Sequence, residues 1–302
     1  MESKLKQEHR LKIARDYELK GESLHAIQVY LSLIEEDPDF TDAYFNLADL
    51  YESLGNMESA VQILKSFLEK DPENKDARMH FGQFLLKNSL WEESVEVLSY
   101  TQDDEPMSSF FIGYSYLMLK DYELAKINFL KFISQQSKSE LLYEAYIYLA
   151  KIEIGLKNFK DALLYAGKAA VFYPEFWELN LIYAIAYYSL EMYTHAILPV
   201  EKAIKLNPKE SSVYEWAGKI YLKIGDYSKA EKNLLRFIES IDSASSDTYT
   251  KLADACLKRE KTKDALNYYE IALKIDPGNN FAAEGMKKAD TLLKKAVTDD
   301  DL

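Results

Sequence analysis

The chain has 302 residues, of which 48% are hydrophobic, so it can bury a large apolar core. Fifty acidic residues outweigh 37 basic ones and give a formal net charge of −13. This charge disfavours binding to nucleic-acid backbones and to anionic membranes, because both need a basic protein surface. We therefore expect no nucleic-acid partner and no membrane insertion.

Three features indicate the cellular location. The N-terminal stretch MESKLK lacks the apolar core of a secretory signal. The aromatic-rich segment 176–190 contains Glu178 and Asn180, so we do not expect it to span a membrane. The single cysteine, Cys256, has no partner for an internal disulfide and is expected to pack in the interior. Together these features predict a cytoplasmic protein.

Residues 41–74 form the unit from which the rest of the sequence is built. Apolar residues recur at spacings of three and four along 43–53 and again along 58–69, which predicts two amphipathic helices. Gly55 breaks the first helix, because glycine tolerates a left-handed backbone, and Pro72 ends the second. The unit is therefore predicted to be a helical hairpin.

Small residues recur at two places of this unit all along the chain. The eighth and twentieth places read Ala14, Ala48, Gly82, Gly113, Ala150, Ala184, Gly218, Ala253 and Ala26, Ala60, Ser94, Ala125, Ala162, Ala196, Ala230, Ala265. Small side chains let the two helices of a hairpin cross closely. A globular core would not place small residues at such regular intervals, so we expect eight consecutive hairpins in one elongated array.

The predicted hairpins follow one another with two irregularities in spacing. After an extension at 1–6 they cover residues 7–40, 41–74, 75–105, 106–142, 143–176, 177–210, 211–245 and 246–279. The third is short, and SQQSKSE lengthens the fourth, so we expect the curvature of the array to change there. Pro199 lies inside a predicted helix and should kink it. A capping helix is expected at 280–297, followed by an acidic, disordered tail at 298–302.

The unit resembles the tetratricopeptide repeat (TPR). Its residues Ala48, Tyr51, Gly55, Ala60 and Pro72 stand at the eighth, eleventh, fifteenth, twentieth and thirty-second places, as in the signature of that family. The resemblance covers nearly the whole chain. It implies an all-α fold, a right-handed α-solenoid superhelix of antiparallel helix hairpins. It also implies a scaffold or adaptor role in protein–protein interaction.

Motifs for catalysis or metal binding are absent from the sequence. We find no glycine-rich phosphate loop, no His-Glu-x-x-His and no nucleophile elbow. The four histidines lie in different repeats without metal-ligand spacing. The carboxylates fall on the polar faces of predicted helices, where a solvated surface role is expected. We therefore expect no enzyme activity, no cofactor and no metal.

In the TPR family the first helix of each repeat lines a concave face through its second, fifth, sixth, ninth, twelfth and thirteenth places. In repeats four to six these places are strongly apolar. The resemblance thus implies a peptide-binding groove formed by Phe110, Phe111, Tyr114, Met118, Ile147, Tyr148, Lys151, Leu181, Ile182, Ile185, Tyr188, Trp216 and Lys219. At the fifth place, as for Ile147 and Leu181, burial against neighbouring helices is the alternative. The sixth- and ninth-place residues are expected to be exposed, among them Ile182 and Ile185.

The expected ligand is a protein or peptide client, bound as a helix or an extended segment through apolar and aromatic anchors. The clamp that some family members use for acidic chaperone tails is not matched. Four of its five places in repeats one to three hold Leu11, Arg15, Asp76 and His80. The alternative function is a self-associating structural scaffold, a homo-oligomer whose concave face packs against another copy.

Overall fold

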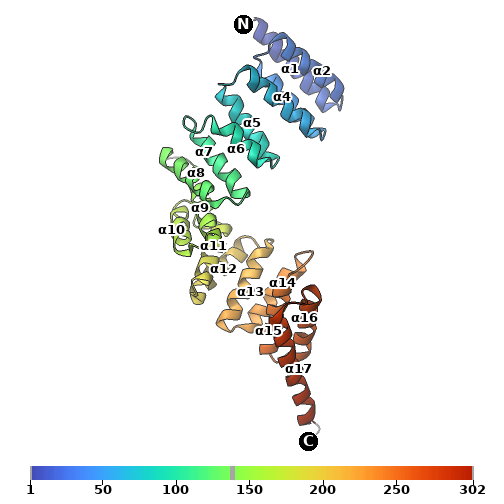
Figure 1. The fold of residues 1–302 in the computed structure, drawn as a ribbon. Coiled ribbons are helices and arrows are strands. Elements are labelled where there is room, and N and C mark those ends of the chain that lie inside the picture. The colour runs from blue at the N-terminus through green and yellow to red at the C-terminus, as the bar shows by residue number, and fades with distance from the viewer. Residues whose placement is uncertain (1, 137–139, 301–302) are drawn as a thin grey trace. The chain divides into compact units, whose positions relative to one another are not determined.

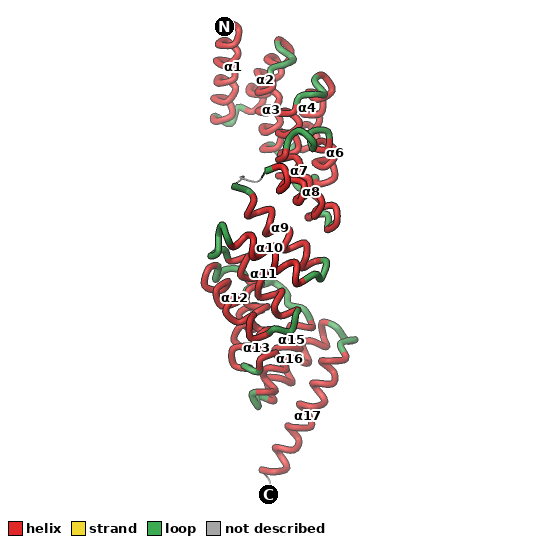
Figure 2. The backbone as a smooth tube through the Cα atoms, turned by 90° about the vertical axis from the view of Figure 1, so that its left-hand side faces the viewer, coloured by secondary structure: helices red, strands yellow, loops and turns green. Residues whose placement is uncertain are grey.

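The computed structural model describes residues 2–136 and 140–300, and in this part of the chain the regular structure is entirely helical (Figures 1 and 2). Contacts divide the chain into unit 1, Met1–Ser137, and unit 2, Lys138–Leu302. In both units each odd-numbered helix packs against the even-numbered helix that follows it. The predicted all-α repeat solenoid is thereby confirmed.

Unit 1 consists of four such hairpins. Its helices are α1 (Glu2–Leu19), α2 (Ser23–Glu36), α3 (Thr41–Ser53), α4 (Met57–Lys70), α5 (Lys75–Lys87), α6 (Trp91–Ser99), α7 (Pro106–Met118) and α8 (Tyr122–Gln135). Residues 2–6, expected as an extension, belong to α1. Helix α6 is short, as the irregular third repeat suggested. Part of SQQSKSE, residues 137–139, lies outside the described residues, and with it the predicted change in curvature.

Unit 2 contains four more hairpins and a final single helix. Its helices are α9 (Leu142–Gly155), α10 (Phe159–Ala170), α11 (Trp177–Ser189), α12 (Tyr193–Leu206), α13 (Ser211–Ile224), α14 (Tyr227–Glu239), α15 (Ser246–Lys258), α16 (Thr262–Ile275) and α17 (Asn280–Asp300). Helix α12 continues past Pro199. Helix α17 covers α16 and runs to Asp300, so part of the expected tail is helical; residues 301–302 lie outside the described residues.

All eight hairpins turn in the same way at their fifteenth place. The residue there has a positive φ in every case, and it is Gly21, Gly55, Ser89, Lys120, Lys157, Glu191, Gly225 or Glu260. The backbone N–H of the next residue donates to the carbonyl of the eleventh place, as from Asn56 to Tyr51 at 2.8 Å. This bond closes the helix end with a left-handed residue, which is the Schellman arrangement. The turn thus forms even where the residue is not glycine.

The hairpin cores are built around the small residues at the eighth and twentieth places. All sixteen are buried. A Cβ on Gly218 would lie 2.5 Å from Leu234 Cγ, so the paired helices approach closely at these positions. Cys256 is also buried, as expected, and burial raises the pKa of its thiol to about 12. It is therefore a packing residue and not a reactive thiolate at neutral pH.

Candidate functional site

The inner layer of unit 2 is formed by its odd-numbered helices. Helix α9 contacts α11, α11 contacts α13, and α13 contacts α15. Among the described residues of this unit, no pair of even-numbered helices comes as close. The odd-numbered helices thus present one continuous layer, and most of the predicted site residues lie on them.

A pocket of about 270 Å3 opens between α9 and α11. It is lined by Lys151, Ile154, Trp177, Glu178, Leu181, Ile182 and Ile185. Four of these residues, Lys151, Leu181, Ile182 and Ile185, were predicted for the site from the sequence. Most of the lining side chains are aliphatic or aromatic, so the pocket suits an apolar side chain better than a charged one.

The polar part of this pocket is an ion pair between the two helices. Lys151 Nζ lies 2.5 Å from Glu178 Oε2, and both side chains are about one-third exposed. The same ammonium lies 5.6 Å from the centre of the Tyr148 ring. Because each charge has an opposite partner, the pair adds little net field to the pocket.

Further along the same layer, three other predicted residues meet at the contact of α11 with α13. The rings of Tyr188 and Trp216 pack edge to face, with centroids 5.5 Å apart. Lys219 Nζ lies 4.5 Å from the Trp216 ring and 2.5 Å from Glu215 Oε1. Burial raises the pKa of Tyr188, so its hydroxyl is neutral at physiological pH. This cluster is a rigid aromatic surface with a hydrogen-bonding edge.

Four further predicted residues lie on α7 of unit 1. Phe111 and Tyr114 are half-buried, and Met118 is exposed. Tyr114 packs edge to face against Trp91 at 6.0 Å. The strip predicted across repeats four to six thus comprises a surface on α7 in unit 1 and a surface on α9 and α11 in unit 2.

Phe110, Ile147 and Ile182 are only 5%, 4% and 4% exposed, so the exposure expected for Ile182 is wrong. Phe110 packs against Phe129 and Phe132 of its own hairpin, at 5.6 and 5.1 Å between ring centroids. Ile147 and Ile182 belong to one core cluster, because α9 and α11 touch directly. Of these three, only Ile182 also reaches the pocket lining.

Sequence reasoning left three lining residues outside the predicted site. Ile154 is at the twelfth place of its repeat, whereas Trp177 and Glu178 begin the next first helix. A large aromatic residue at the start of a first helix is the signal that could have pointed to Trp177. In the described residues, no cluster of His, Cys, Asp and Glu could hold a metal ion. Nor is any helix there long and apolar enough to cross a membrane.

Comparisons with family models agree with the repeat pattern. A model described as tetratricopeptide repeat matches residues 29–62 and 200–232, and a second with the same description matches residues 217–280. Among curated proteins, the chain is similar to an Hsp70-Hsp90 organizing protein of Triticum aestivum, with 27% identity over 106 residues. That match covers 35% of this chain and 18% of the wheat protein.

Solved structures share the fold at low sequence identity. One chain of the Cut9-Hcn1 hetero-tetramer of the APC/C aligns with a TM-score of 0.60 at 16% identity. This alignment covers 88% of the present chain and 52% of the matched chain. The C-terminal part of a TPR repeat-containing protein from Cytophaga hutchinsonii aligns with a TM-score of 0.55 at 20% identity. This alignment covers 73% of the present chain and 88% of the Cytophaga chain. A fragment of MamA from Desulfovibrio magneticus aligns with a TM-score of 0.51 at 19% identity. This alignment covers 57% of the present chain and 98% of the MamA fragment.

Proposed function

Because the chain is a tetratricopeptide repeat protein, we propose that it is a non-catalytic adaptor that binds a client peptide on the inner layer of its odd-numbered helices. Proteins of this family act through protein–protein contacts. The name of the wheat relative, an organizing protein for Hsp70 and Hsp90, supports a general interaction role. The cytoplasmic location stays a prediction from the sequence.

The observation that carries the proposal is the apolar pocket between α9 and α11. At about 270 Å3 it is slightly smaller than the ~300–1,000 Å3 typical of sites for whole small molecules. It therefore suits one anchoring side chain of a longer ligand. Leu181 and Ile185 supply apolar contact, and the Lys151–Glu178 pair can hydrogen-bond to the ligand backbone at the rim.

The aromatic cluster of Tyr188 and Trp216 supplies a second anchor point on the same layer. Helices α11 and α13 are in contact, so a helix or an extended segment seated in the pocket can continue over this cluster. Tyr and Trp bury much area while losing little side-chain freedom, which favours binding. Phe111, Tyr114 and Met118 on α7 are proposed as a further contact surface, in unit 1.

The alternative is a scaffold in which another copy of the chain covers these residues. Light scattering over a concentration series separates the two functions. Only self-association makes the average mass rise with concentration.

A peptide selection tests the adaptor function. Random peptides displayed on phage are selected on the wild-type protein, and their affinity is measured by calorimetry. Leu181→Asp with Ile185→Asp should weaken binding by about tenfold or more, because each substitution places a charge in the apolar pocket. The matched control is Leu164→Asp with Leu198→Asp, on the even-numbered helices α10 and α12, where these side chains are 56% and 63% exposed.

The control variant should bind as the wild type does. Circular dichroism checks that both double variants keep their helical content. If the Leu181→Asp, Ile185→Asp variant loses helical content, the milder Leu181→Ala, Ile185→Ala variant takes its place. Equal affinity of the pocket variant and the wild type would contradict the proposed site.

A further inference from the structure

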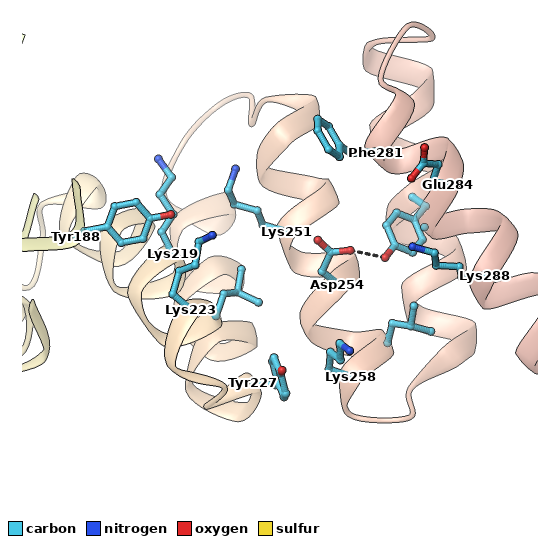
Figure 3. Close-up of a pocket in the computed structure, with 14 residues that line it drawn as sticks. Tyr188, Lys219, Lys223, Tyr227, Lys251, Asp254, Lys258, Phe281, Glu284 and Lys288 are labelled. Atoms are coloured by element: carbon cyan, nitrogen blue, oxygen red, sulfur yellow. Dashed lines mark hydrogen bonds between the residues drawn. The ribbon is translucent and has the colours of Figure 1, made fainter. Parts of the chain in front are cut away.

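A second pocket, of about 530 Å3, lies in the part of unit 2 where α17 packs beside α15 (Figure 3). It draws residues from α11, α13, α14, α15, α16 and α17, and Leu181 and Ile185 are not among them. Its lining is Tyr188, Lys219, Leu222, Lys223, Tyr227, Lys251, Asp254, Leu257, Lys258, Tyr269, Phe281, Glu284, Gly285 and Lys288. Five lysines thus face two carboxylates, in a chain whose net charge is −13.

Three of the five lysines form no direct ion pair among the described residues, although the charges of Lys258 and Lys288 act on Asp254. Lys219 and Lys251 pair with Glu215 and Asp247, one turn earlier on the same helices. Lys223, Lys258 and Lys288 form no such pair. Because an ammonium group favours a nearby negative charge, these three side chains give the pocket a local preference for anions that opposes the charge of the whole chain.

One of the two carboxylates in the pocket, Asp254, already accepts a hydrogen bond from a neighbouring side chain. Tyr269 donates its hydroxyl hydrogen to Asp254 Oδ1 at 2.5 Å (Figure 3). Desolvation raises the pKa of the Asp254 carboxyl, although the lysine charges oppose that rise. The partial removal of water that this indicates strengthens any charge interaction made there.

The pocket also offers apolar contact. Phe281, near the start of α17, is 80% exposed, which is unusual for so large an apolar side chain. Leu222 and Leu257 lie on the facing helices. A neighbouring hollow of about 540 Å3 shares Leu257, Lys258 and Lys288 and adds Lys287, so the basic surface extends along α17.

We propose that this pocket binds an acidic segment of a partner protein, in which Asp and Glu residues flank one apolar side chain. The carboxylates meet Lys223, Lys258 and Lys288, and the apolar side chain packs on Phe281. A phosphate chain fits less well, because its continuous charge would meet Asp254, Glu284 and the acidic remainder of the protein. Helix α17, expected only as a cap, thereby becomes part of a binding site.

Fluorescence anisotropy with a defined probe tests this proposal. The probe is a labelled peptide of Asp and Glu residues around one Phe, acetylated and amidated so that it has no terminal charges. The pocket variant is Lys223→Gln, Lys258→Gln and Lys288→Gln. The control variant has the same change of net charge and consists of Lys202→Gln, Lys232→Gln and Lys263→Gln, on α12, α14 and α16, where all three lysines are exposed.

The expected result is that the pocket variant binds the probe about tenfold or more weakly, since three partly solvated charge pairs are lost. The control variant and the Leu181→Asp, Ile185→Asp variant should stay within about twofold of the wild type. A peptide with Asn and Gln in place of the acids should not bind. Because the two pockets are tested by different substitutions, failure here is distinguishable from failure of the proposed function.

Several results would overturn the proposal. They are no binding of the acidic probe, equal binding of the amide peptide, or equal losses in the pocket and control variants. A single-stranded oligonucleotide that binds more tightly than the peptide and is released by the same pocket substitutions would assign the site to nucleic acid instead.

Discussion

Gly285 of α17 lies so close to Tyr269 of α16 that a Cβ built on it would be 2.3 Å from the ring carbon Cζ. The ring cannot easily move away, because it is fully buried and its hydroxyl is bonded to Asp254. Gly285→Ala should therefore displace α17 and lower the free energy of unfolding by about 1–3 kcal/mol. Thermal unfolding, together with hydrogen exchange along α17, measures the effect.

The matched control is Gly167→Ala on α10, a helix-interior glycine whose added Cβ would come no closer than 3.9 Å to Tyr183 Oη. There the added Cβ makes only an ordinary van der Waals contact, and the higher helix propensity of alanine should raise stability by up to about 1 kcal/mol. We therefore expect the two variants to change the free energy of unfolding in opposite directions. A stabilising Gly285→Ala would show that α17 is not packed as described.

The hairpin turns offer a second prediction. Glu191 has a φ of 61°, a left-handed conformation that costs a residue with a side chain about 1–2 kcal/mol. Glu191→Gly should thus raise the melting temperature, although greater freedom of glycine in the unfolded chain reduces the gain.

The reverse substitution at an equivalent turn serves as the control. Gly55→Ala should lower the melting temperature, and the reason is conformational only, since nothing lies within 4 Å of the added Cβ. A loss of stability on Glu191→Gly would contradict the shared turn geometry.

A third prediction concerns the close crossing of two helices of one hairpin. Ala162 is fully buried on α10, which packs against α9. Ala162→Leu adds volume where the helices need to approach, so we expect a loss of about 1–3 kcal/mol in the free energy of unfolding, measured by urea denaturation. No change in stability would show that the twentieth place is not at the crossing.

Glu231 on α14 accepts hydrogen bonds from Arg259 Nη1 and Lys261 Nζ, both at 2.5 Å, and so connects α14 to the turn between α15 and α16. Desolvation alone would raise the pKa of this carboxyl, but the two cationic partners outweigh it and lower the pKa below its ordinary value of 4.5. The folded state thus binds fewer protons than the unfolded state around that pH. Its contribution to stability is present above the unfolded pKa and lost as pH falls through the folded pKa.

Glu231→Gln should therefore cost about 1–3 kcal/mol at about pH 7. The difference from the wild type should shrink once the pH falls below about 4.5. Urea denaturation at several pH values measures this difference. A difference that is independent of pH would contradict an ionised, hydrogen-bonded Glu231.

The helices could be predicted from the sequence because the signals for them are local. Apolar spacing marks each helix, and small residues such as Ala48 and Ala60 mark where paired helices cross. The turns between paired helices could be predicted from the sequence only in part. Glycine marks three of them, whereas Lys120 or Glu191 carries no sign of a left-handed conformation and is held in it by the hydrogen bonds that end the helix.

The candidate site could be predicted less well, because it depends on contacts between hairpins. The place of Ile182 in its repeat predicts that it faces the inner layer, but not that it is buried in one core cluster with Ile147 of the preceding hairpin. The basic pocket was missed for the same reason. Lys223, Lys258 and Lys288 stand in three separate segments, and the packing of α15 beside both α13 and α17 brings them to one pocket.

Site-specific photo-crosslinking tests the central claim, binding of a client on the inner layer, most directly. A photoreactive residue replaces either Tyr148 on α9 or Leu164 on α10, the two helices of one hairpin. A peptide selected on the wild-type protein is added, and the products are mapped by mass spectrometry. The proposal predicts a crosslink from position 148 and none from position 164; a crosslink from position 164 alone would contradict it.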